Sequence, residues 1–159
     1  MQARSKVKAK SLSVRAAVPS DAPRVTECVR AAYTPWVSRI GREPWPMLQD
    51  YAAVIATEHV FVAETGAQLA GVLVLSETAD GFLIDNVAVF PVQKGQGVGR
   101  ALLVYAEQEA KRRGYGSIYL FTNEKMLENI ALYTKIGYVE YERRQETGFC
   151  RVFMRKVLR

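Results

Sequence analysis

The chain has 159 residues, of which 49% are hydrophobic and 24% are charged; this composition suits one folded domain and excludes an intrinsically disordered protein. No apolar run reaches membrane-spanning length and no apolar secretion signal opens the sequence, so we expect a cytoplasmic protein that does not enter the membrane. The formal net charge is +6, but four basic residues lie in the first ten, and removing them leaves +2, which makes a nucleic-acid-binding domain an unfavoured interpretation.

We expect a basic, disordered tail over residues 1–11 and a single domain over residues 12–159. A nucleic-acid role for the tail is an alternative, and it would predict salt-dependent binding that is lost on deleting the tail. The two cysteines, Cys28 and Cys150, lie far apart and lack metal-type spacing. They are therefore predicted to be reduced, packed thiols, and no metal site is expected.

The first half of the chain is predicted to place helices ahead of an apolar β-hairpin. Ser20 or Asp21 is expected to cap a helix that has Pro23 in its first turn and runs to about Tyr33. Three prolines between positions 35 and 46 prevent one continuous helix in the next segment. The other elements expected here are a strand over residues 12–16, a short helix over 51–57, and strands over 60–63 and 69–75.

Residues 83–100 are the most informative stretch. An apolar run over 83–90, rich in β-branched residues and ended by Pro91, predicts a buried strand. Glycines follow at positions 95, 97 and 99, and an apolar pattern at helical spacing begins at Val98 and ends at Gly114. The first turn of a helix has unpaired N–H groups and a positive dipole end, and glycines leave them accessible. The stretch therefore predicts a phosphate-binding cradle.

Two well-known glycine loops do not fit this cradle. A P-loop requires Gly-Lys-Ser/Thr, whereas Gly99 is followed by Arg100 and Ala101, and the dinucleotide fingerprint requires a wider G-x-G-x-x-G spacing. Residues 94–99, Lys-Gly-Gln-Gly-Val-Gly, instead resemble the acetyl-CoA signature of the GNAT superfamily of N-acetyltransferases, usually Gln/Arg-x-x-Gly-x-Gly/Ala. Lys94 stands where Gln or Arg is usual, and its positive charge still suits a pyrophosphate.

A second motif follows in the family's order and spacing. Residues 128–138, Glu-Asn-Ile-Ala-Leu-Tyr-Thr-Lys-Ile-Gly-Tyr, resemble the GNAT segment Asn-x-x-Ala-x-x-Leu-Tyr-x-Lys-x-Gly-Phe. The positions that match in register are Leu132, Tyr133, Lys135 and Gly137. The departures are Met126 and Asn129, which replace the usual Asn and Ala, and Tyr138, which replaces Phe.

The remaining elements complete a mixed α/β sheet with helices on both faces. Strands are expected over residues 117–121, 138–141 and 149–157, and a helix over 126–136 that Gly137 stops. The resulting order, β-α-α-β-β-β-α-β-α-β-β, is that of the GNAT fold. The resemblance thus covers almost the whole chain beyond the tail.

The resemblance implies an enzyme that moves the acetyl group of acetyl-CoA directly to a primary amine of a small molecule or peptide. In the family, the tyrosine at the position of Tyr133 protonates the departing thiolate; the alternative is a packed helix aromatic with its hydroxyl at the rim. Asn129 lies four residues earlier and shares its helix face. The residues implied to bind acetyl-CoA are Val87, Ala88, Val89, Lys94, Gly95, Gln96, Gly97, Val98, Gly99, Arg100, Asn129 and Lys135.

The base that deprotonates the amine is open at this point. Some family members carry a glutamate on the strand before the tyrosine helix, but Phe121 occupies that position here. Asp85 is the next candidate, because a carboxylate in an apolar strand is costly unless it is paired or functional; a hydrogen-bonded structural role is the favoured interpretation. His59, the one histidine, is expected to be structural.

The acceptor pocket is expected between residues 33 and 51, although this segment has the alternative of packing down on the core. Two other interpretations of the chain are a non-catalytic acyl-CoA-binding module and an acetyltransferase of protein N-termini or lysines. Edge strands near the C-terminus suit a homodimer. The expected acceptor-binding residues are Tyr33, Trp36, Arg39, Arg42, Trp45 and Met47.

Overall fold

The computed structural model describes residues 11–146 and 148–159, so the predicted basic tail lies, apart from residue 11, outside the described residues. The strands are β1 (Leu12–Ala16), β2 (His59–Thr65), β3 (Gln68–Thr78), β4 (Gly81–Val89), β5 (Ser117–Asn123), β6 (Val139–Glu146) and β7 (Phe149–Val157). The helices are α1 (Ala22–Tyr33), α2 (Val37–Ile40), α3 (Tyr51–Thr57), α4 (Val98–Arg112) and α5 (Leu127–Lys135). No helix of this described part has the length and apolar content that crossing a membrane requires.

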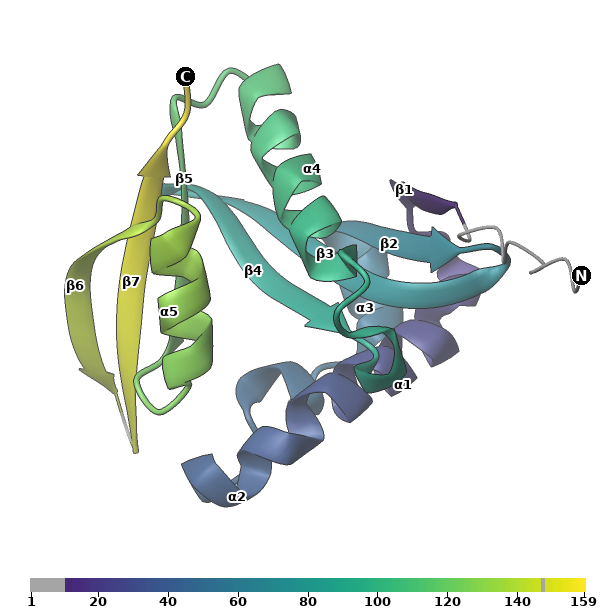
Figure 1. The fold of residues 1–159 in the computed structure, drawn as a ribbon, viewed down its shortest axis with the longest axis horizontal. Coiled ribbons are helices and arrows are strands. Elements are labelled where there is room, and N and C mark those ends of the chain that lie inside the picture. Colours follow the sequence, from purple (N-terminus) through teal and green to yellow (C-terminus); the bar gives the residue numbers. More distant parts are fainter. Residues whose placement is uncertain (1–10, 147) are drawn as a thin grey trace, which may run out of the picture.

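The strands form one mixed sheet in the order β1-β2-β3-β4-β5-β7-β6 (Figure 1). Neighbouring strands are antiparallel except β4 and β5, which are parallel. Helices α1 and α3 pack on one face, whereas α4 and α5 pack on the other. Because both faces of β3 and β4 are covered, these strands are apolar almost throughout instead of alternating. This arrangement confirms the predicted fold class.

Local structure departs from the prediction at two places and agrees with it at a third. Asp21 precedes α1 but does not cap it, because its carboxylate accepts the N–H of Val18 (2.8 Å) and pairs with Arg15. As predicted, the proline-containing segment has no continuous helix; it forms the one-turn helix α2 between two 3₁₀ turns, Thr34–Trp36 and Trp45–Leu48. Strand β6 is longer than predicted because its charged, exposed residues pair with β7 along the sheet edge, where no apolar pattern is needed.

Strands β4 and β5 diverge soon after they begin to pair. Only residues 82–84 pair with 118–120, although β4 continues to Val89; Figure 1 shows the two strands separating. Asp85 has no partner on β3 either, since the register shifts between Ile84 and Asn86, which is a β-bulge. The β5 side of residues 85–89 is therefore a strand edge whose N–H and C=O groups have no neighbouring strand.

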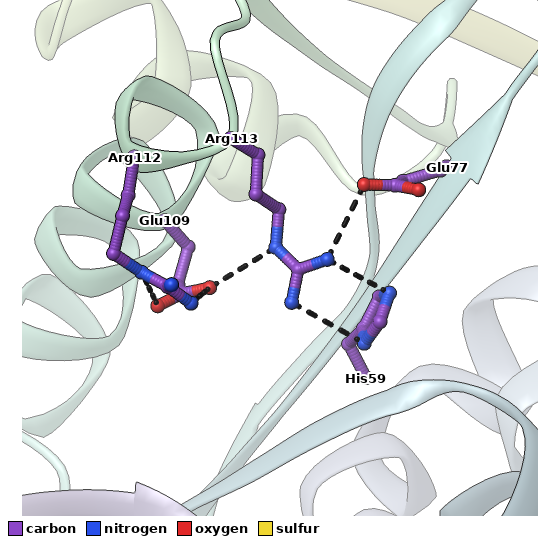
Figure 2. A network of polar contacts seen from close by, with 5 residues as sticks. All are labelled: His59, Glu77, Glu109, Arg112 and Arg113. Atoms are coloured by element: carbon purple, nitrogen blue, oxygen red, sulfur yellow. Dashed lines mark hydrogen bonds and ion pairs between the residues drawn. The ribbon is translucent and has the colours of Figure 1, made fainter.

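A polar network holds the C-terminal end of α4 against β2 and β3 (Figure 2). Arg113 donates to Glu109 (3.2 Å) and Glu77 (3.3 Å), and its Nη1 lies 3.2 Å from Nε2 of His59. Glu109 is only 7% exposed and also accepts two hydrogen bonds from Arg112. The hydrogen bond from Arg112, followed by that from Arg113, lowers the pKa of Glu109. The one histidine thus lies in a network that joins a helix end to two strands.

We expect Glu109→Gln to lower the free energy of unfolding at neutral pH by about 1–2 kcal/mol, because its charge-assisted hydrogen bonds become weaker ones without the carboxylate charge. The loss is no larger because Arg112 is exposed and solvent screens its interaction with Glu109. The folded-state pKa of Glu109 lies below its ordinary value of 4.5. Its stabilising contribution is therefore complete above that value and is lost as the pH falls through the folded-state pKa. Urea unfolding over this range should show the two proteins converging at acidic pH; a constant difference would contradict the assignment.

Candidate functional site

The divergence of β4 and β5 opens a cleft of about 440 Å³. It is bounded by the free edge of β4, the loop before α4, the end of α1 and one side of α5. All residues predicted to bind the coenzyme line this cleft except Gln96, which is exposed in the loop, and Lys135, which is exposed in the last turn of α5. The two motifs recognised in the sequence therefore meet across one cavity.

The glycine loop ends this cleft with main-chain donors. Gly95 and Gly97 have φ angles of 80° and 81°, and a Cβ at either position would meet no atom within 4 Å. Gly97 precedes the first residue of α4 and supplies no side-chain cap. Among the described residues, the N–H groups of residues 95–100 make no hydrogen bond. Together with Lys94 and Arg100, they form an open, positive site that fits a pyrophosphate.

Gly71 on β3 sets how closely α4 approaches the sheet. A Cβ at Gly71 would lie 2.9 Å from the carbonyl oxygen of Ala88 and 2.9 Å from side-chain atoms of Val98 and Leu102. Glycine at this position lets the first turns of α4 pack directly over β3 and β4. The role of Gly71 was not predicted from the sequence, although a glycine inside an apolar strand often marks such a close approach.

Tyr133 lies on α5 at the other side of the cleft. Its ring is 8% exposed and makes an edge contact with Tyr138 at a centroid distance of 5.9 Å. No described residue is hydrogen-bonded to its hydroxyl. Burial raises the pKa of Tyr133 to about 12, so the phenol keeps its proton at neutral pH. Asn129, one helical turn earlier, lines the same cavity.

A second pocket of about 100 Å³ adjoins the cleft and is lined by residues 84–87 of β4 and 120–123 of β5. Trp45, Phe121 and Phe149 contribute aromatic walls, and Asp85 and Arg151 contribute charged groups. The residues that line both cavities are Tyr33, Val87, Met126, Asn129 and Tyr133. Helix α5, which carries Tyr133, therefore lies where the two cavities meet.

A hydrogen-bonded chain holds three residues that line this pocket, Tyr33, Pro46 and Asn86. The Tyr33 hydroxyl donates to Oδ1 of Asn86 (2.8 Å), and Nδ2 of Asn86 donates to the Tyr51 hydroxyl (3.1 Å). Tyr51 in turn donates to the carbonyl oxygen of Pro46 (2.6 Å). Asn86 is 4% exposed, so its satisfied amide ties α1, α3 and the Trp45–Leu48 turn to β4. Neither Asn86 nor this chain of contacts was predicted from the sequence.

The residues expected to bind the acceptor are only partly brought together. Tyr33 and Trp45 line the small pocket, whereas Trp36 lines the larger cleft. The three others line neither cavity: Arg39, in an ion pair with Glu128; Arg42, stacked on the ring of Phe149 at 3.5 Å; and Met47, which is buried.

Asp85 lines the small pocket, but its predicted hydrogen-bonded role is not found. No residue in the described part of the chain donates a hydrogen bond to its carboxylate or pairs with it. Burial is the main cause that raises the pKa of Asp85; the charge of Glu58 acts in the same direction and that of Arg151 opposes it. The carboxylate is therefore a half-buried acceptor without a donor. The described residues contain no group of three His, Cys, Asp or Glu side chains arranged to hold a metal.

Comparison with known proteins finds N-acetyltransferases among the similar sequences and structures. The chain is 30% identical over 80 residues to the [ribosomal protein bS18]-alanine N-acetyltransferase of Escherichia coli strain K12, covering 50% of this chain and 54% of that protein. The chain thus spans about half the length of the curated relatives it matches. A similar fold occurs in the PaiA N-acetyltransferase of Thermoplasma acidophilum in complex with coenzyme A, with a TM-score of 0.79 and 16% identity over 92% of this chain and 99% of that one. Another occurs in yncA of Salmonella typhimurium with acetyl-CoA, with a TM-score of 0.69 and 18% identity over 94% of this chain and 95% of that one.

The solved structures are only 16% and 18% identical to this chain, so the similarity supports the fold alone. The family model described as "Acetyltransferase (GNAT) family" matches residues 25–138, which include the glycine cradle, the free edge of β4 and Tyr133. This match spans most of the chain. The chain belongs to the acetyltransferase (GNAT) family.

Proposed function

We propose that this protein is an N-acetyltransferase that moves the acetyl group of acetyl-CoA to a primary amine. One observation carries the proposal: a single cleft has a cradle of free main-chain donors at one end and the Tyr133 hydroxyl at the other, where a second pocket opens. The cradle suits the pyrophosphate of a coenzyme, and the second pocket suits an acceptor. A site that binds both reactants side by side accelerates their reaction through proximity.

The chain offers distinct groups to each part of the coenzyme. The N–H groups of residues 95–100, with Lys94 and Arg100, would hold the pyrophosphate. The unpaired edge of β4 at Val87 and Val89 would bind the pantetheine amides as an added strand binds. Acetyl-CoA supplies the activated thioester and leaves as coenzyme A at each turnover, so it acts as a substrate.

Tyr133 is proposed to protonate the leaving sulfur. The nitrogen lone pair forms the new C–N bond while the C–S bond breaks, and the electron pair of that bond leaves on sulfur. Starting from an ammonium, the nitrogen releases two protons: one balances the proton that Tyr133 gives to sulfur, and the other passes to solvent. The pKa of about 12 keeps Tyr133 in its acid form. Burial also raises the pKa of a thiol, so the acidity of the leaving group shifts in the same direction as that of Tyr133.

The experiment that tests this function combines binding with turnover. Titration calorimetry should show acetyl-CoA and coenzyme A binding with a Kd on the order of 1–100 μM, that is about −5.5 to −8 kcal/mol. A panel of primary amines should then release free thiol in the presence of acetyl-CoA. Absence of binding to either form of the coenzyme would refute the assignment. Binding without thiol release, across small amines and peptides, would leave a non-catalytic acyl-CoA-binding module.

A second candidate acceptor is the N-terminus of a polypeptide. Its support is the named activity of the curated relative, which acts on an alanine of a ribosomal protein and matches this chain over 80 residues. Free-N-terminus peptides and lysine peptides belong in the same amine panel. An N-terminal acetyltransferase would prefer the former to any small amine.

We also propose that the protein works in the cytoplasm, because Cys28 and Cys150 are both free thiols. Burial raises the pKa of Cys28 to about 12, so this thiol is unreactive at neutral pH and serves as a buried core side chain. The homodimer predicted from the edge strands stays a prediction, which light scattering on the purified protein would test.

A further inference from the structure

The charged residues that line the small pocket indicate which charge the acceptor bears. Among its described lining residues, Asp85 supplies the one carboxylate and Arg151 the one cationic group. Asp85 lies at the β-bulge in β4 and lines the same pocket as Val87 and Tyr133. A half-buried carboxylate with no donor is costly, and a bound cation removes that cost. The charge next to the reaction centre therefore favours an acceptor that arrives as an ammonium.

The groups around Asp85 do not replace such a cation. Glu58 repels its negative charge, and Tyr33 and Tyr51 face it as neutral phenols whose pKa values are raised by burial. Arg151 is the nearby positive group, but it forms an ion pair with Glu146 (3.1 Å). The guanidinium of Arg151 also lies over the ring of Phe121 at 4.7 Å. Its fixed position makes it a poor partner for Asp85 and leaves the carboxylate available to a ligand.

The rest of the pocket favours a compact apolar group. Trp45, Phe121 and Phe149 line it, together with prolines 44 and 46. Its volume is about 100 Å³, against about 440 Å³ for the coenzyme cleft, which favours a compact buried group. Apolar walls of this kind gain free energy only from apolar ligand surface.

In the part of the chain that the structure describes, the pocket lacks a group that would bind a second positive charge on the acceptor. The lining offers no further carboxylate among the described residues, and Arg151 repels a nearby cation. Building repulsion against an alternative ligand is a common source of specificity. Polyamines and other polycations are therefore disfavoured acceptors.

We propose that the acceptor is a hydrophobic primary monoamine, which bears its single positive charge on the reacting nitrogen, and that Asp85 binds this ammonium and takes its first proton. The inference rests on the proposed acetyl transfer and names its substrate class. Asp85 accepts one of the two protons that nitrogen loses and later returns it to solvent. The neutral amine that remains next to Asp85 supplies the lone pair for the new C–N bond.

A substrate series with three classes of amine tests the substrate class. Isoamylamine and phenethylamine represent hydrophobic monoamines, spermidine represents polycations, and a free-N-terminus peptide and a lysine peptide represent polypeptides. We expect kcat/KM for the monoamines to exceed that for every other class by at least tenfold. A preference for spermidine or for either peptide would overturn the proposal.

Asp85→Asn tests the role of the carboxylate. We expect kcat/KM for the monoamine to fall at least 100-fold at neutral pH, and the deficit to shrink above the pKa of the free amine, where the proton has already left. Binding of acetyl-CoA should be unchanged, which also reports that the variant is folded. The matched control is Asp80→Asn on the exposed turn between β3 and β4, which should behave as wild type. A loss of the same size at every pH, or no loss, would exclude Asp85 as the ammonium site.

The two proposals fail in different ways. If the chain were not an acetyltransferase, no amine would release thiol and both Asp85 variants would be silent. If only the substrate class were wrong, acetyl-CoA would bind and turn over with another amine. Asp85→Glu adds a further check, because a retained carboxylate on a longer side chain should recover part of the neutral-pH activity that Asp85→Asn loses.

Discussion

Tyr133→Phe should bind acetyl-CoA as tightly as the wild-type protein and turn over about 100-fold more slowly or worse. General acid catalysis contributes about 10²- to 10⁴-fold, and the substitution removes only the hydroxyl that donates the proton. The ring of Tyr133 is buried at the junction of the two cavities, and its hydroxyl has no hydrogen-bond partner among the described residues. Phenylalanine therefore keeps the packing and loses the chemistry.

The measurement is kcat from thiol release at saturating acetyl-CoA, with calorimetric Kd for the coenzyme as the second readout. Tyr138→Phe is the matched control, because Tyr138 touches Tyr133 and its own hydroxyl is buried without a partner in the described structure. This control should keep its activity and lose no stability. Because the pKa of Tyr133 is about 12, wild-type activity should show no alkaline loss from this group below about pH 11. Unchanged turnover in Tyr133→Phe would remove the residue from the mechanism.

Gly97→Ala should raise the Kd for acetyl-CoA by roughly 10- to 100-fold. A Cβ added at this position would have no protein atom within 4 Å, and it would lie beside the first free N–H groups of α4, where the phosphate is expected to bind. Losing one charge-assisted hydrogen bond to a phosphate costs about 1.5–3 kcal/mol, which corresponds to this range. The φ angle of 81° adds strain of about 1–2 kcal/mol to the folded state.

Gly114→Ala separates the strain from the binding effect. Gly114 follows the other end of α4, has a φ angle of 86°, and likewise has no atom within 4 Å of an added Cβ. Both substitutions should lower the free energy of unfolding by a similar amount in urea titrations. Only Gly97→Ala should weaken acetyl-CoA binding in calorimetry. Equal coenzyme affinity in the two variants would show that the cradle does not hold the pyrophosphate.

Periodic and local signals in the sequence predicted most of the fold. The helix over residues 51–57 and the strand over 12–16 match α3 and β1 at both ends. The glycine loop and the start of α4 follow from backbone preferences that act within a few residues. Strand β6 was underestimated because its exposed, charged residues follow no apolar pattern, and only its pairing with β7 extends it.

The candidate acceptor site depended on contacts between distant segments. Asn86 joins Tyr33 and Tyr51 across 53 and 35 residues, and the sequence contains no pattern that pairs them. Arg39 and Arg42 were expected at the acceptor because of their charge, yet Glu128 and Phe149 engage them. Long, charged side chains find partners according to the tertiary arrangement, so proximity in sequence was a weak guide.

By itself, the sequence determined the family, the order of strands and helices, and the cradle and tyrosine helix that face the coenzyme cleft. These features arise from short-range backbone geometry and side-chain periodicity, which are written in consecutive residues. Only the tertiary structure decided where β4 parts from β5, that Asp85 lacks a donor, and that Arg151 from the last strand shares its pocket. Those facts depend on strand register and on which side chains meet across the sheet, and a linear pattern does not specify either one.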